Sequence, residues 1–189
     1  MDDHTRLQTL DWEAYTKCAR RAAADGIVLL RNEKNVLPLP DGCRVSLFGR
    51  GQLTYYKSGT GSGGMVNVSH VTGIREALDE DPGIILNREL MHLYDRWNDE
   101  NPPVTGKGWG NDPWSQPEMP LTPDIVKRAA LVSDAAVCIL ARTAGEDRDL
   151  TDEPGSYRLT DTEMQMLELV RGSFERMIVL LNVGSVIDM

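Results

Sequence analysis

The stretch Ala135-Ala-Val-Cys-Ile-Leu-Ala-Arg-Thr-Ala-Gly-Glu-Asp-Arg-Asp149 decides the fold of this chain. Its first six residues are continuously apolar, which is typical of a strand buried on both faces of a sheet. Its second half is small, polar and charged, as expected of a loop that follows such a strand. Further short apolar runs predict strands at Ile27–Leu30, Val45–Phe48, Gly83–Leu86 and Met177–Val183.

Amphipathic helices are expected between these strands. Asp11 can cap a helix that runs to about Ala24, and Thr122 can cap another with Pro123 at its first position. Thr160-Asp-Thr-Glu163 is a capping box. Its helix is expected to point Met164, Leu167, Val170 and Phe174 inward. Two more helices are expected at 71–79 and 87–99.

Strands that alternate with helices predict an α/β fold with a mostly parallel sheet and helices on both faces. Functional loops of such sheets lie beyond the carboxyl ends of the strands. Gly49–Gly64 and Arg142–Tyr157 are therefore the best candidate loops. A third irregular segment, residues 100–121, holds several prolines and glycines, and long loops of this kind are often functional.

Length and composition exclude several classes of protein. The 189 residues fit one domain, and a net charge of −9 argues against nucleic-acid binding. Three widely spaced cysteines suggest neither a disulfide framework nor a zinc site, and Cys138 is expected to be a core residue. The polar start and the lack of a long apolar run predict a cytoplasmic protein that does not bind a membrane. The scattered histidines form no metal motif, and no cofactor is expected.

The glycine-rich segment Lys57-Ser-Gly-Thr-Gly-Ser-Gly-Gly-Met65 can bring backbone N–H groups close to a ligand. Phosphate binding is one interpretation, but a P-loop needs its lysine after the glycines, and a dinucleotide fingerprint must follow its strand directly. A flexible surface loop is the simpler alternative.

Two other segments carry candidate functional side chains. In the loop after Leu140, Glu146 can stand exposed above the sheet, although Arg142 and Arg148 could instead pair with neighbouring aspartates in a solvated charge cluster. In the long loop, Trp109 and Trp114 suit a carbohydrate subsite because sugars stack on aromatic rings. The alternative is that these tryptophans attach the loop to the core.

The order and spacing of several segments resemble the α/β-sandwich domain of family 3 glycoside hydrolases. The similar segments are Ala22–Glu33, Asn35–Leu39, Val45–Arg50, Lys57–Gly64, Thr143–Arg148, Leu159–Asp161 and Ile178–Ser185. The short N-terminus, residues 55–68 and the tryptophan-containing insertion look like the β-glucosidase subgroup in which this domain precedes the (β/α)8 barrel. The resemblance covers residues 11–189 and follows a short tail at 1–10.

The resemblance implies an (α/β)6-sandwich-like domain that is incomplete at its C-terminus. It also implies a retaining mechanism in which Glu146 is the acid/base and a barrel aspartate is the nucleophile. The family's common spacing is GEGxDR, and this sequence is shorter there, so Asp147 and Asp149 stay as alternative positions. The residues expected to bind the β-glucoside or oligosaccharide are Lys57, Ser58, Gly59, Thr60, Gly61, Ser62, Trp109, Trp114 and Arg148.

The resemblance therefore predicts a domain that is nearly inactive without its barrel and hydrolyses terminal β-linked glucosyl residues when joined to it. The rival hypothesis is a non-catalytic α/β module that binds a carbohydrate or a protein and covers its exposed interface by self-association.

Overall fold

The computed structural model describes residues 10–108, 110–146 and 148–188. The chain divides into two compact units, residues 1–37 and residues 38–189. Each unit is described by itself below.

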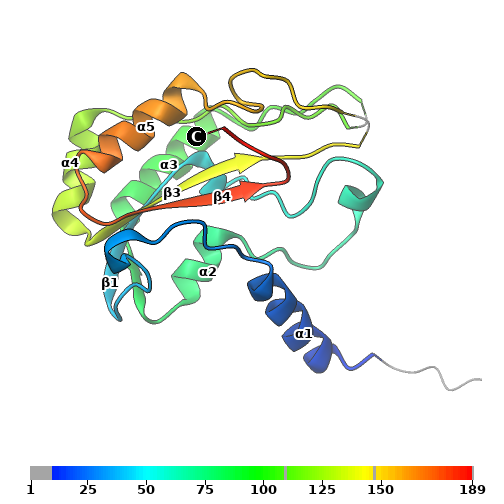
Figure 1. Ribbon diagram of the computed structural model, residues 1–189, viewed down its shortest axis with the longest axis horizontal. Helices are drawn as coiled ribbons and strands as arrows, with labels where there is room; N and C mark the ends of the chain where they lie inside the picture. The colour runs from blue at the N-terminus through cyan, green and yellow to red at the C-terminus, as the bar shows by residue number, and fades with distance from the viewer. Residues whose placement is uncertain (1–9, 109, 147, 189) are drawn as a thin grey trace, which may run out of the picture. The chain divides into compact units, whose positions relative to one another are not determined.

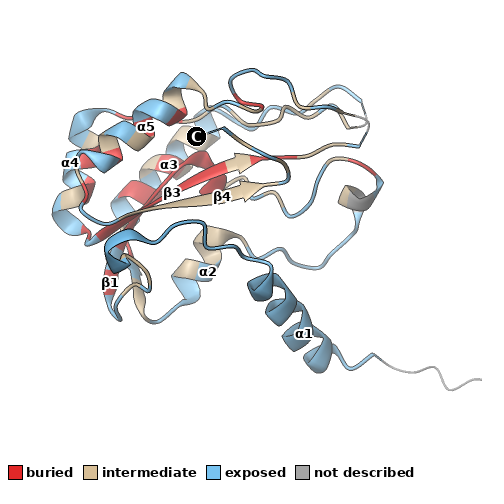
Figure 2. Cartoon of the chain, viewed as in Figure 1, coloured by how far each residue is buried: buried red, intermediate tan, exposed pale blue. Residues whose placement is uncertain are grey.

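Within residues 10–37, the described part of the first unit, there are one helix, α1 (Trp12–Asp25), and a short 3₁₀ turn, η1 (Glu33–Asn35). The side chain of Asp11 accepts a hydrogen bond from the backbone N–H of Ala14, as the predicted helix cap requires. Every residue of α1 is exposed (Figure 2).

The prediction of a strand at Ile27–Leu30 is wrong. These four residues are irregular, and each side chain is more than 60% exposed. A strand needs the hydrogen bonds of a neighbouring strand, and none pairs with this run among the described residues. The apolar pattern alone could not report that missing partner.

The second unit is built on a four-stranded parallel sheet (Figure 1), which confirms the predicted fold class. Its strands are β1 (Cys43–Phe48), β2 (Ile84–Leu86), β3 (Ala135–Arg142) and β4 (Met177–Val183). Their spatial order is β2-β1-β3-β4. Leu47 is level with Val137 of β3, and Val137 is level with Ile178 of β4. The two central strands are buried on both faces except at Arg44, as the mostly apolar sequences of both strands predict.

One face of the sheet packs against three helices, α3 (Arg88–Glu100), α4 (Pro123–Val132) and α5 (Asp161–Arg171). Phe48, Cys138 and Leu140 supply the sheet side of this core. The other face carries Val45, Leu47 and Ile139, and α2 (Ile74–Glu80) covers part of it. Helices therefore lie on both faces, and Cys138 is the core residue that the sequence predicted (Figure 1).

Two burial predictions need correction. Met164 points outward and is 44% exposed, whereas Met166 and Val170 enter the core. Val170 and Phe174 are buried and Leu167 packs against the core, as predicted, whereas Glu163 takes the buried position beside the outward-facing Met164. All seven residues of β4 are only partly buried, since β4 pairs with β3 and forms an edge of the described sheet.

The turn after β1 requires glycine. Gly49 has a φ of +97°, and a Cβ added to it would lie 2.2 Å from the backbone oxygen of Ile139. Only glycine permits both this conformation and this approach to β3. The glycine-rich loop therefore leaves the sheet directly beside the carboxyl end of β3.

Candidate functional site

The candidate site lies where three loops meet beyond the carboxyl ends of β1 and β3. The loops are 49–64, 143–158 and the long segment 101–121. The N–H of Thr143 donates to the backbone oxygen of Trp114, and the N–H of Thr60 donates to the backbone oxygen of Ala144. These two bonds attach the other loops to the residues that follow β3.

Glu146 stands on the first turn of the loop after β3. Its N–H donates to the oxygen of Thr60 at 3.0 Å, and Thr60 forms a parallel bridge with Gly145. Its carboxylate oxygen Oε2 accepts a hydrogen bond from the N–H of Ser62 at 3.2 Å. The side chain is exposed, so a neutral backbone donor orients the carboxylate while leaving it accessible to solvent.

Gly61 makes this approach possible. Its backbone (φ +143°, ψ −172°) lies in a region that is essentially limited to glycine. A Cβ at this position would lie 2.9 Å from Glu146 Oε2 and 3.0 Å from Glu146 Cβ. The close packing of the two loops therefore depends on the absence of a side chain at Gly61.

We expect Gly61→Ala to destabilise the chain by about 1–3 kcal/mol, because alanine is strained in this backbone conformation. The substitution should also push the Glu146 carboxylate away from Ser62. Urea unfolding measures the first effect. Gly172→Ala is the matched control, since Gly172 has a helical φ of −72° and no contact closer than 3.4 Å. Equal stability losses in the two variants would contradict the argument.

Three N–H groups of the glycine-rich loop already have protein acceptors. Thr60 donates to Ala144, Ser62 donates to Glu146, and Gly64 donates to Gly61. A phosphate cradle needs converging N–H groups that are free to bind the ligand. The loop geometry therefore supports holding Glu146 better than it supports holding a nucleotide.

The other predicted residues of this loop lie in different surroundings. Gly59 packs on Ala144, where a Cβ would lie 2.6 Å from the Ala144 oxygen. Lys57 and Ser58 line a shallow pocket of about 350 Å³ together with Val66, Val68 and His70. The ammonium group of Lys57 donates to the backbone oxygen of Val66.

Arg148 holds the long loop. Its Nη1 donates to the backbone oxygens of Gly110 and Asp112, at 2.8 and 2.6 Å. Its guanidinium also stacks over the ring of Trp114, with 4.2 Å between the guanidinium carbon and the ring centroid. The structure thus brings Arg148 and Trp114 together, and Arg148 attaches the tryptophan-containing loop to the loop of Glu146. Trp109 and Asp147 lie outside the described residues.

Arg142 does not belong to the solvated charge cluster that was one interpretation of its sequence. Its side chain is buried and forms an ion pair with Glu163, 21 residues further along the chain. The sequence revealed the capping box of Thr160 and Glu163. It gave no indication that Glu163 pairs with Arg142.

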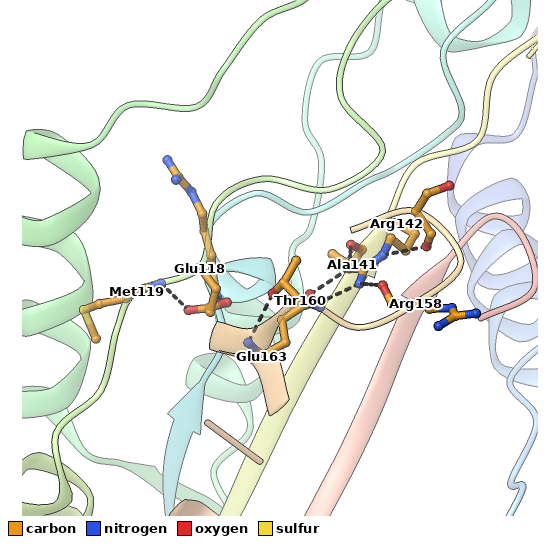
Figure 3. Close-up of polar contacts among 9 residues, drawn as sticks. Glu118, Met119, Ala141, Arg142, Arg158, Thr160 and Glu163 are labelled. Carbon is orange, nitrogen blue, oxygen red and sulfur yellow. Dashed lines mark hydrogen bonds and ion pairs between the residues drawn. The ribbon is translucent and has the colours of Figure 1, made fainter. Parts of the chain in front are cut away.

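Glu118 is a second carboxyl that the sequence did not single out. It accepts a hydrogen bond from the N–H of Arg50 at 2.6 Å and another from the N–H of Met119 at 2.8 Å, the second of which is drawn in Figure 3. Burial raises the pKa of Glu118 from 4.5 to about 7, although these two donors lower it. Burial and the charge of Glu118 also raise the pKa of the neighbouring Tyr94 hydroxyl.

Glu118 should make stability depend on pH. The folded chain keeps the Glu118 proton up to pH about 7, whereas the unfolded chain loses it near 4.5. Stability therefore falls as the pH rises between these values, by at most about 3 kcal/mol. We expect Glu118→Gln to remove this fall, measured by urea unfolding from pH 5 to pH 8. Glu168→Gln, on the exposed face of α5, is the control. A pH dependence that Glu118→Gln leaves unchanged would contradict the prediction.

No helix among the described residues is long and apolar enough to cross a membrane. Within the same residues, the acidic, histidine and cysteine side chains form no cluster that could hold a metal ion.

Comparison with known proteins matches residues 27–189 to the glycosyl hydrolase family 3 C-terminal domain. A β-glucosidase of Ruminococcus albus is 52% identical over 180 residues, which are 95% of this chain and 19% of that protein. β-Glucosidase A of Butyrivibrio fibrisolvens is 32% identical, over 88% of this chain and 22% of its own length. The chain thus spans about a fifth of the length of the relatives it matches.

The solved structures that this chain resembles are also β-glucosidases. A β-glucosidase from Paenibacillus barengoltzii superposes with a TM-score of 0.90 at 49% identity, over 94% of this chain and 19% of that one. β-Glucosidase 3B from Thermotoga neapolitana in complex with α-D-glucose gives 0.83 at 30% identity, over 96% of this chain and 26% of that one. Fold and sequence together define the chain as an α/β domain of a glycoside hydrolase. It belongs to glycosyl hydrolase family 3 and corresponds to the C-terminal domain of that family.

Proposed function

We propose that this chain carries the acid/base, Glu146, of a retaining β-glucosidase-type hydrolase. A (β/α)8 barrel outside these 189 residues would supply the aspartate nucleophile. The observation that carries the proposal is the position of the Glu146 carboxylate, exposed beyond the carboxyl end of β3 and oriented by the N–H of Ser62. Family membership and the β-glucosidase relatives support it.

The proposed chemistry has two steps. In the first, Glu146 protonates the glycosidic oxygen while the aspartate attacks the anomeric carbon and forms a glycosyl-enzyme. In the second, the Glu146 carboxylate takes a proton from water while the water oxygen attacks the same carbon and the bond from that carbon to the aspartate breaks. Because Ser62 binds Oε2, we assign the proton transfers to Oε1. The two carboxyl groups must come within about 5–5.5 Å, which requires the barrel to dock on this edge of the sheet.

The loops around Glu146 would form one wall of the sugar cleft, for a terminal β-linked glucosyl residue. We propose that the substrate contacts residues 57–62 and the aromatic loop with Trp109 and Trp114. Arg148 would contribute by holding that loop in place, since its guanidinium binds two loop oxygens and the Trp114 ring.

The test is hydrolysis of phenyl β-glucoside by the purified chain, alone and mixed with a separately expressed family 3 barrel. A suitable barrel is the Paenibacillus barengoltzii β-glucosidase from which the region matching this chain has been deleted. We expect neither part to be active alone and the mixture to be active.

Activity of the chain alone would show that a complete site exists within these residues and would overturn the proposed division of the site. Formation of a stable complex without activity would favour the rival hypothesis, a non-catalytic module that binds a carbohydrate or a protein.

A further inference from the structure

Arg142 is a buried cation directly next to the loop of Glu146. It is the last residue of β3, and its side chain is 1% exposed. Its Nη1 and Nη2 donate to the two carboxylate oxygens of Glu163, each at 2.7 Å (Figure 3). Bidentate pairs of this kind fix orientation as well as charge. The guanidinium therefore has one defined position relative to α5.

The same guanidinium also binds the backbone at the far end of the loop that follows β3. Its Nε donates to the backbone oxygen of Ser156 at 3.0 Å, and Nη2 donates to that of Arg158 at 3.3 Å (Figure 3). The loop thus begins at Arg142 and comes back to its side chain 14 residues later. Fixing both ends of a loop reduces the conformations available to every residue between them.

Glu163 connects Arg142 and the loop to the start of helix α5. Its Oε2 also accepts hydrogen bonds from the N–H and the hydroxyl of Thr160, at 2.8 and 3.2 Å, in the capping box that opens α5. Thr160 at the start of α5 therefore fixes the Glu163 carboxylate, which fixes the Arg142 guanidinium. Arg142 begins the loop, and its guanidinium binds the backbone where the loop ends. Glu146 lies within that loop, four residues after Arg142.

We infer that Arg142 is a positioning residue for the acid/base: through Glu163 and the backbone of Ser156 and Arg158, it fixes the loop that presents Glu146. This inference rests on the proposed function of Glu146. Arg142 itself is buried and is not assigned any contact with substrate.

Two substrates with different leaving groups can distinguish a misplaced acid/base from a loss of folded protein. Phenyl β-glucoside needs a proton on its leaving oxygen, whereas 2,4-dinitrophenyl β-glucoside releases a stable anion without one. A misplaced Glu146 carboxyl therefore slows only the hydrolysis of phenyl β-glucoside. A smaller amount of folded protein lowers both rates by the same factor.

The variant for this test is Arg142→Met combined with Glu163→Gln. It removes both charges together, while glutamine can still accept the Thr160 N–H. With the chain mixed with the barrel, we expect kcat/KM to fall at least about tenfold for phenyl β-glucoside and less than about twofold for the dinitrophenyl substrate. Arg44→Met is the control, because Arg44 pairs with Asp134 at the opposite end of the sheet and should leave both rates unchanged.

Equal losses on the two substrates would overturn the inference. Glu146→Gln is measured alongside: if it shows no dependence on the leaving group, the proposed function itself fails. If Glu146→Gln shows the dependence and the Arg142 variant does not, only the role of Arg142 fails.

Hydrogen exchange on the chain alone gives a second readout that needs no activity. The N–H groups of Thr60 and Glu146 bond across the two loops, and those of Val137 and Val179 belong to the sheet. In the double variant we expect faster exchange at Thr60 and Glu146 and unchanged exchange at Val137 and Val179. Unchanged exchange at all four would also overturn the inference.

Discussion

Glu146→Gln is expected to lower the hydrolysis of phenyl β-glucoside by the reconstituted enzyme by about 10²–10⁴-fold, the usual contribution of a positioned proton donor. Glutamine keeps the size of the side chain and can still accept the Ser62 N–H, so the loops should stay in place. It cannot give a proton to the leaving oxygen. The loss should therefore shrink when the leaving group is dinitrophenolate.

Azide offers an independent check of the second step. Azide attacks the glycosyl-enzyme without help from a base, so it should restore turnover of the dinitrophenyl substrate by Glu146→Gln and give β-glucosyl azide. Glu153→Gln is the matched control, an exposed glutamate of the same loop. Full activity in Glu146→Gln together with a large loss in Asp149→Asn would move the acid/base to Asp149.

The central strands were predictable because their signal is local. β3 is apolar from Ala135 to Leu140 and β1 is mostly apolar, and the structure buries both strands between two layers of side chains. Helix starts were equally predictable, since the capping side chains of Asp11, Thr122 and Thr160 each bond to a backbone N–H three residues ahead.

Features that depend on distant partners were not predictable from the residues alone. The run Ile27–Leu30 has the composition of a strand but no neighbour among the described residues. In the predicted inward stripe of α5 only Met164 was wrong, since the neighbouring Glu163 is the buried residue and is paired there with Arg142. A hydrophobic pattern contains no information about that pairing.

The candidate site was predictable in part. A charged loop after a buried strand indicated where to look, and the family resemblance singled out Glu146 within it. The contact between Glu146 and Ser62 joins residues 84 positions apart, so no local pattern reveals it. Nor did the sequence mark Glu118, since its raised pKa comes from burial, which no local pattern reveals.

Arg142→Met alone is expected to destabilise the chain by about 3–5 kcal/mol, because it leaves the Glu163 carboxylate buried without its partner. A loss of this size is a large fraction of the stability of a typical domain. Urea unfolding of the purified chain measures it. Arg44→Met is again the control and should cost less than about 1 kcal/mol, since the Arg44–Asp134 pair is exposed.

The double variant decides whether the cost comes from the unpaired charge. Arg142→Met with Glu163→Gln no longer buries a lone carboxylate, so it should be about 2 kcal/mol more stable than Arg142→Met alone. The hydrogen bonds from Arg142 to Ser156 and Arg158 are missing in both variants and cancel in this comparison. If both variants are equally unstable, the lost loop contacts dominate and the buried charge contributes little. A double variant as stable as the original chain would mean that Arg142 serves the placement of the loop and adds nothing to the free energy of folding.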